Sequence, residues 1–295
     1  MTARRVRVGC DFRFSTDAPV HSVVQVQPRR DGEVRLVREA WKTDPTLDVR
    51  DFRDVYGNRC RRLTMPGDDL ALTYDALVDV PPASDDHEPG AAQVPIDDLP
   101  DDTLAFTLPS RYCLSDALSD AAWELFGATD MGWARVQAVC DWVHENIRFE
   151  MGASTSLTTA IDVFERRIGV CRDFAHLSIT FCRALNIPAR YVFGYLPDIG
   201  VPPAPEPMDF CAWFDAFLGG RWWTFDARYN TPRTGRIPIG RGRDALDVAM
   251  VTTYGGAQLK EMVVWADEVE QGKHGSQRPA PESSESSTGG LERRV

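Results

Sequence analysis

The chain changes its hydrophobic period twice, and the order of these changes restricts the fold. Over the first 80 residues, short alternating or β-branched segments are separated by Asp-Gly, Gly-Asn and Pro-Gly turn signals. Residues 116–186 carry apolar side chains at helical spacing, and residues 189–229 return to strand-like segments. Because strands and helices come in blocks without βαβ alternation, the sequence predicts an α+β fold that begins with a small antiparallel β-sandwich or barrel.

These blocks predict four parts. Residues 1–81 form the β domain, and residues 110–266 form the second domain. Between them, residues 82–109 read as an acidic, Pro-rich linker; the stretch 82–102 carries seven acids and no Lys or Arg, which is most of the net charge of −11. We expect a solvated connection there. Residues 267–295 contain almost no large apolar residue, which is typical of a disordered tail.

Composition excludes several classes of protein. Hydrophobic residues make up 43% of the chain and charged residues 26%, as in ordinary globular proteins. No apolar run approaches the roughly 20 residues of a membrane span, and the first residues lack a signal-peptide core. An acidic chain without a basic stripe predicts neither a nucleic-acid nor a membrane partner. We therefore expect a cytoplasmic protein, whose seven cysteines are thiols rather than a disulfide framework.

One of these cysteines stands where a helix should begin. Cys171 follows Gly169 and Val170 at the start of the predicted helix 170–186. The free backbone N–H groups and the dipole at such a position favour a thiolate, which lowers the thiol pKa from its ordinary value of about 8.5. Cys171 is therefore the candidate nucleophile.

A predicted hairpin supplies a carboxylate and a second thiol. With Gly219-Gly220 as its turn, residue 213 faces Asp226, a carboxylate in an otherwise apolar run. Cys211 shares this face as a diagonal neighbour of Asp226, about 7–8 Å away. The hairpin thus predicts one face for packing and one that presents Cys211 and Asp226 together.

Two long segments carry a family resemblance: GVCRDFAHLSITFCRALNIPARYVFGY and DFCAWFDAFLGGRWWTFDARYN. They resemble the bacterial transglutaminase-like superfamily, in its group of predicted cysteine proteases with an N-terminal β domain. The resemblance extends upstream through residues 56–58 and 110–113 and downstream to about residue 255. It therefore covers most of the chain.

The resemblance implies a papain-like core with a Cys–His–Asp triad that acts on an amide or acyl group without a cofactor. Cys171 matches the nucleophile and Asp226 the aspartate, whereas Cys211 stands at the position of the histidine. A thiol is a poor general base near neutral pH, so the inherited mechanism must be altered. The implied substrate is a peptide, a protein or a small amide or acyl compound.

Three interpretations follow from this departure. Cys171 acts as a nucleophile, with Cys211 or a water as proton relay; or the chain is a non-catalytic scaffold or peptide-binding module; or the new thiol serves another chemistry. In the third case Cys171, Cys211 and Asp226 bind a metal such as zinc, or the two thiols form a reversible disulfide.

Other side chains complete the predicted site. Trp213 and Trp222 lie on the Asp226 face by hairpin parity, where they line a substrate groove or pack. His144 and His176 are the candidates for a replacement base, against the alternative that each is a helix histidine satisfied by packing or a local hydrogen bond.

The Gly/Arg-rich segment 235–248 predicts a loop near the cleft. Its arginines Arg236, Arg241 and Arg243 are candidates to meet an acidic group of the substrate.

Overall fold

The computed structural model describes residues 2–203 and 206–269 of the chain. Six strands precede the first helix, and five of them coincide with predicted segments; the short β4 was not predicted. They are β1 (Arg4–Ser15), β2 (Val20–Val24), β3 (Arg35–Asp44), β4 (Arg50–Arg53), β5 (Arg59–Met65) and β6 (Asp69–Val80).

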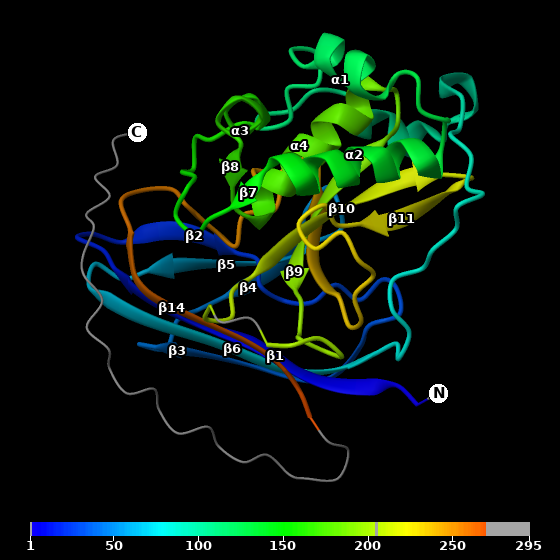
Figure 1. The fold of residues 1–295 in the computed structure, drawn as a ribbon. Helices are drawn as coiled ribbons and strands as arrows, with labels where there is room; N and C mark the ends of the chain where they lie inside the picture. Colours follow the sequence, from blue (N-terminus) through cyan, green and yellow to red (C-terminus); the bar gives the residue numbers. More distant parts are fainter. Residues whose placement is uncertain (1, 204–205, 270–295) are drawn as a thin grey trace.

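Two antiparallel sheets are built from these strands and from two at the C-terminal end. The sheet orders are β14-β1-β6-β3 and β13-β2-β5-β4. β13 (Val251–Thr253) pairs with β2. β14 (Gln258–Glu268) pairs with β1, as the orange and blue strands of Figure 1 show. The chain thus returns to its first domain near its end, whereas the sequence had placed residues up to 266 in the second. The predicted disordered tail lies outside the described residues from residue 270 onward.

The two sheets enclose one hydrophobic core. Along β6 every second side chain is buried, from Leu70 to Val80, as the predicted alternation requires. Val24 and Met65 of the facing sheet belong to the same core, and so does Tyr195 of the second domain. The predicted β-sandwich is confirmed, and its core extends into the second domain.

The acidic connection is more structured than its charge indicates. It contains two short 3₁₀ helices (Ile96–Asp98 and Asp101–Phe106), and Ala91 is buried in the core of the second domain. Asp85 accepts a hydrogen bond from the backbone N–H of Arg233 at 2.9 Å. Most residues of the stretch 82–102 are exposed, and the connection packs against the second domain at particular residues such as Asp85 and Ala91.

Four helices cover one side of the second sheet (Figure 1). They occupy predicted segments: α1 (Ser119–Phe126), α2 (Trp133–Asn146), α3 (Ala160–Arg166) and α4 (Cys171–Ala184). Every residue of α4 from Asp173 to Arg183 is buried, because the sheet lies on one side of it and the other helices pack around it. Among the described residues no helix is long and apolar enough to cross a membrane.

The second sheet has the order β11-β10-β9-β12. Its strands are β9 (Ala189–Tyr195), β10 (Cys211–Leu218), β11 (Arg221–Phe225) and β12 (Ile237–Gly242). The predicted hairpin register is confirmed, since Leu218 pairs with Arg221 and Phe214 with Phe225. Both turn glycines have positive φ, 58° and 87°, as a type I′ turn demands.

β12 occupies residues 237–242 of the segment 235–248 that was predicted to be a loop, and residues 243–248 form turns as predicted. β12 pairs with β9, and a Cβ at Gly240 would lie 2.5 Å from Nε2 of Gln25 in the β domain. Glycine leaves room there for the side chains of Gln25 and Val248, so a pattern that resembles a loop belongs in part to a strand packed against the first domain.

Asn58 joins the two domains. It is fully buried, donates a hydrogen bond from Nδ2 to the carbonyl oxygen of Arg241 at 2.8 Å, and accepts one from the Arg241 backbone N–H at 2.8 Å. The domains are therefore held together by buried polar contacts as well as by the shared core.

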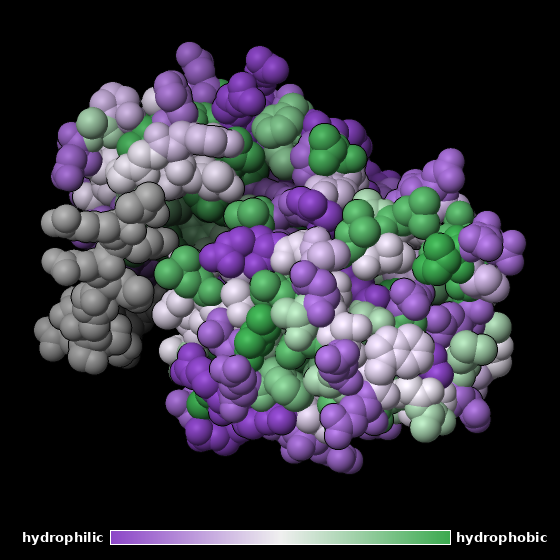
Figure 2. All heavy atoms as spheres, turned by 90° about the horizontal axis from the view of Figure 1, so that it is seen from above, coloured by the Kyte–Doolittle hydropathy of each residue, from purple (hydrophilic) through white to green (hydrophobic). Residues whose placement is uncertain are grey.

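The outer surface over the helices mixes hydrophilic and hydrophobic side chains in small groups (Figure 2).

Candidate active site

Cys171 is the first residue of α4, and its side chain is only partly buried. The carboxylate of Asp173 folds back to accept a hydrogen bond from the backbone N–H of Val170 at 2.8 Å. A Cβ at Gly169 would lie 2.7 Å from the Cβ of Asp173, so glycine leaves room for this cap. The Gly-Val-Cys sequence thus begins the helix at Cys171 and turns its thiol toward β10.

The second thiol lies directly against the first. Cys211, the first residue of β10, is 5% exposed and shares a small apolar cluster with Cys171 and Trp213. The Cys171 sulfur lies 4.0 Å from the carbonyl oxygen of Phe210. A hydrogen bond between the two thiols lowers the pKa of Cys171, and burial opposes this effect. The same hydrogen bond, together with burial, raises the pKa of Cys211 well above its ordinary value.

The remaining five cysteines behave differently. Burial raises the pKa of Cys60 to about 11 and that of Cys10, Cys113 and Cys182 to about 12, and it raises the pKa of Cys140 as well. All five are buried. Their surroundings are those of packing residues, as the sequence indicated, and Cys171 differs from them in both exposure and pKa direction.

Arg228 supplies a cation beside the thiol pair. Its guanidinium lies over the rings of Phe149, 3.8 Å from the centroid, and Tyr229, 4.7 Å away. Burial disfavours its charge, but attraction to Cys211, Tyr229, Cys171 and Asp226 raises the pKa of Arg228 overall. Its positive charge in turn lowers the pKa of Cys171. Sequence reasoning missed this residue, although it lies only two positions after Asp226.

Asp226 follows the end of β11, and its two carboxylate oxygens have different partners. Oδ1 accepts hydrogen bonds from the backbone N–H groups of Arg228, at 3.0 Å, and Tyr229, at 3.3 Å. Oδ2 forms an ion pair with Nη1 of Arg236 at 3.0 Å. The negative charge of Asp226 contributes to the raised pKa of Cys211.

Arg236 connects this carboxylate to the linker. Its Nε lies 2.9 Å from Oδ2 of Asp85, and its guanidinium lies 4.9 Å from the centre of the Trp213 ring. Attraction to Asp226 and Asp85 raises the pKa of Arg236 despite its burial. A buried chain of alternating charge, Asp85–Arg236–Asp226, therefore borders the thiol pair.

Asp209 is a second residue that sequence reasoning missed. Its half-buried carboxylate accepts a hydrogen bond from the backbone N–H of Phe210 at 2.7 Å. Burial raises the pKa of Asp209, and its charge opposes ionisation of Cys171. Its position directly before Phe210 and Cys211 was the available signal.

Backbone groups hold both candidate histidines. The buried ring of His176 accepts a hydrogen bond at Nε2 from the Ala245 N–H at 3.1 Å and lies between Tyr112 and Tyr191. Burial lowers the pKa of His176 well below 6.5, so it remains a neutral packing residue. His144 is exposed, and its Nδ1 donates to the carbonyl oxygens of Ala227 at 3.2 Å and Arg228 at 3.0 Å. His144 thereby anchors the backbone that follows Asp226.

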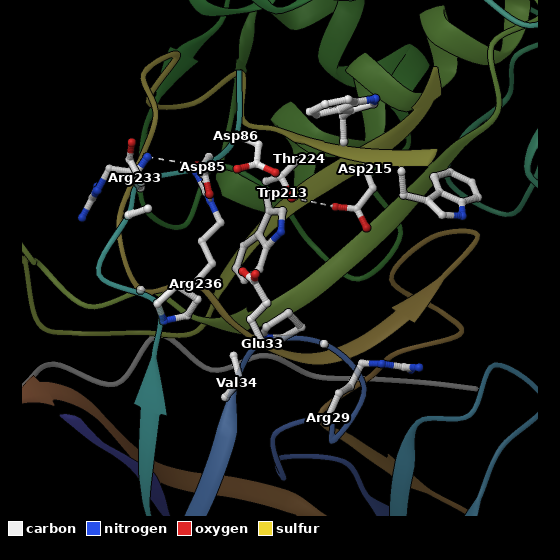
Figure 3. A pocket seen from close by; sticks show the side chains of 18 of the residues that line it. Arg29, Glu33, Val34, Asp85, Asp86, Trp213, Asp215, Thr224, Arg233 and Arg236 are labelled. Carbon is white, nitrogen blue, oxygen red and sulfur yellow. Dashed lines mark hydrogen bonds and ion pairs between the residues drawn. The ribbon is translucent and has the colours of Figure 1, made fainter. Parts of the chain in front are cut away.

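Trp213 and Trp222 line a cleft of about 530 Å³ between the hairpin, the linker and loop 29–34 of the β domain. Figure 3 shows Trp213 in this cleft with Arg236 beside it. Arg241 also lines the cleft, whereas Arg243 forms an ion pair with Asp247 at 3.0 Å. Trp213 therefore belongs both to the cleft and to the apolar cluster around the thiols.

The alternative zinc site is not formed. Within the part of the chain that the structure describes, no three His, Cys, Asp or Glu side chains are arranged to hold a metal ion. Arginine and backbone N–H groups already occupy the Asp226 oxygens that a metal would need.

Comparison with known proteins identifies the family. The transglutaminase-like superfamily matches residues 121–227. A crystal structure described as a "putative cysteine protease" from Cytophaga hutchinsonii is similar at 33% identity and a TM-score of 0.83, over 92% of each chain.

Two curated relatives are uncharacterized mycobacterial proteins. The one from Mycobacterium leprae is 36% identical over 118 residues, 39% of this chain and 42% of the relative's length. The one from Mycobacterium tuberculosis is 29% identical over 242 residues, 75% of this chain and 77% of the relative. With a matching family core and a relative of known structure that it covers almost entirely, the chain belongs to the transglutaminase-like superfamily.

Proposed function

We propose that the protein is a cysteine-dependent acyl-transfer enzyme or amidohydrolase with Cys171 as its nucleophile. One observation carries the proposal: the Cys171 thiol is partly exposed at a helix N-terminus and its pKa is lowered, whereas burial raises the pKa of the five packing cysteines. A thiolate rather than a thiol attacks a carbonyl carbon, so these are the surroundings that a nucleophile needs.

Cys211 acts as the proton relay in this proposal. Because its pKa is raised, Cys211 keeps its proton while Cys171 is ionised. The Cys171 sulfur attacks the acyl carbon, the bond to the leaving group breaks, and the Cys211 thiol gives its proton to that leaving group. The charge left on Cys211 is then balanced by Arg228. In deacylation, Cys211 takes a proton from the attacking water or amine.

This relay favours particular substrates. A thiol is a weaker general acid–base catalyst near neutral pH than an imidazole, because its ordinary pKa lies further from 7. Leaving groups that need little protonation, such as the thiolate of a thioester, are therefore transferred more readily than the amine of an unactivated amide. We assign the cleft beside Trp213 and Trp222 to the part of the substrate that extends from the acyl group.

Trapping of an acyl-enzyme tests the proposal. The protein is incubated with a small aryl thioester, and the acyl adduct is located by intact-mass and peptide mass spectrometry. We expect an adduct on Cys171 that is lost in Cys171→Ala and retained in Cys60→Ala, a packing cysteine of the β domain. Adducts spread over several cysteines, or none on Cys171, would instead favour a non-catalytic scaffold.

A further inference from the structure

We propose that Cys171 and Cys211 form a peroxide-reactive dithiol, in which a hydroperoxide oxidises Cys171 and Cys211 then closes a reversible disulfide across the site. This reaction is separate from acyl transfer, because it needs only the two thiols and an oxidant. It would be retained by a chain that had lost acyl-transfer activity.

The two cysteines meet at the ends of packed elements. Cys171 begins α4 and Cys211 begins β10, and α4 packs directly on β10. Both thiols belong to one small apolar cluster, and the Cys171 sulfur lies 4.0 Å from the carbonyl oxygen of Phe210, the residue directly before Cys211. A disulfide between the two thiols requires Cα atoms about 4.4–6.8 Å apart.

The difference in exposure between the two thiols indicates which of them reacts with the peroxide first. Cys171 is partly exposed and can meet a small peroxide, whereas Cys211 is 5% exposed. Thiolates attack peroxides, and the positive charge of Arg228 together with the α4 N-terminus favours the thiolate of Cys171. Cys171 is therefore the peroxidatic thiol and Cys211 the resolving thiol.

The chemistry balances with a hydroperoxide as oxidant. The Cys171 thiolate attacks the distal oxygen, the O–O bond breaks, and a sulfenic acid and an alkoxide result; the alkoxide then takes a proton from water. The Cys211 thiol next attacks the sulfenic sulfur, an S–S bond forms and water leaves. Together the two thiols lose two electrons and two protons, and an added dithiol reverses the change.

A second pair of cysteines provides an internal control. Cys140 and Cys182 lie close enough for the charge of one to raise the pKa of the other, but both are fully enclosed in the core between helices. They share the proximity of the Cys171–Cys211 pair and lack its exposure. If proximity alone were sufficient, both pairs would be oxidised.

The experiment treats the folded protein with hydrogen peroxide and maps disulfides by peptide mass spectrometry without reduction. We expect a Cys171–Cys211 linkage, loss of the mass of two hydrogen atoms, complete reversal by dithiothreitol, and reduced Cys140 and Cys182. In Cys211→Ala we expect dimedone, a reagent for sulfenic acids, to label Cys171 several-fold more than in the parent, since no thiol remains to resolve the intermediate. Cys182→Ala should leave the linkage unchanged.

Different outcomes would overturn the inference. Equal dimedone labelling of Cys171 in the parent and in Cys211→Ala, with no linkage, would show that Cys211 does not resolve the sulfenic acid. A Cys140–Cys182 linkage of equal yield would show that local unfolding rather than the site controls oxidation. The readout in the parent needs no variant and no acyl substrate, so its failure is distinguishable from failure of the proposed acyl transfer.

Discussion

The Asp226 carboxylate is ion-paired to the Arg236 guanidinium, with Oδ2 3.0 Å from Nη1. In the triad that the family resemblance implied, this carboxylate would orient a histidine. With Cys211 at the histidine position, Asp226 instead accepts hydrogen bonds from two backbone N–H groups and forms an ion pair with an arginine. Nε of Arg236 forms a second ion pair with Asp85, so a carboxylate from the linker also balances the guanidinium charge beside the thiols.

Asp226→Asn should destabilise the protein, because it removes one of the two acids that compensate a buried guanidinium. Breaking a buried ion pair costs about 3–5 kcal/mol, and the remaining contact to Asp85 reduces this to roughly 2–3 kcal/mol. Urea unfolding measures the change. The matched control is Asp86→Asn, which breaks the exposed pair with Arg221 and should change stability by less than about 0.5 kcal/mol. Equal effects of the two variants would contradict a buried role for Asp226.

Arg228→Gln should make Cys171 less reactive. The variant removes the positive charge that lowers the pKa of Cys171, so the thiolate fraction at neutral pH falls. We expect several-fold slower alkylation by iodoacetamide at pH 7 and a smaller difference at pH 10, where the thiol ionises without help. Arg228→Lys should retain most of the rate, and the exposed Arg148→Gln should retain all of it. An unchanged pH profile in Arg228→Gln would remove Arg228 from the site.

The sequence predicted what depends on local pattern. The period-two runs and the Gly219-Gly220 turn fixed the hairpin register, and helical spacing identified the buried side of α2. These inferences succeed because side-chain direction follows from the period of a single element.

The rest depends on contacts between distant segments. β12 was taken for a loop because its glycines serve a close approach to the β domain, which no local pattern reports. Arg228 and Asp209 were missed because their importance comes from the charges around them after folding. The pairing of β14 with β1 joins opposite ends of the chain, beyond the range of any local signal.

Trp222→Ala should weaken substrate binding more than chemistry. Trp222 lines the cleft and lies under the Arg190 guanidinium, 4.1 Å from the ring centre, so its removal leaves Cys171 untouched. We expect KM for the aryl thioester to rise several-fold, with kcat and the iodoacetamide rate changed less than twofold. A fall in kcat at unchanged KM would place the substrate outside this cleft.

His176 should make stability depend on pH. Burial lowers its folded pKa well below 6.5, so the unfolded chain binds the proton more readily. The stability that this histidine contributes is present above pH 6.5 and is lost as pH falls below it, by about 1.4 kcal/mol per pH unit until the folded pKa is reached. In His176→Gln, whose amide oxygen can still accept from the Ala245 N–H, the loss between pH 7.5 and 5.5 should shrink by about 1 kcal/mol in urea unfolding. A parent-like slope in His176→Gln would contradict this origin.

Cys211→His should raise amide cleavage, because it supplies the imidazole that the family's triad uses. General acid–base catalysis by a positioned side chain contributes about 10²–10⁴-fold, and we expect the lower end, since Asp226 remains paired to Arg236. Combining Cys211→His with Arg236→Met frees Asp226 to accept from the imidazole and should raise the rate further. Release of amine from a peptide amide measures the change, with turnover of the aryl thioester as reference. If amide and thioester turnover rise equally, then protonation of the leaving group is not the step that limits amide cleavage in the parent.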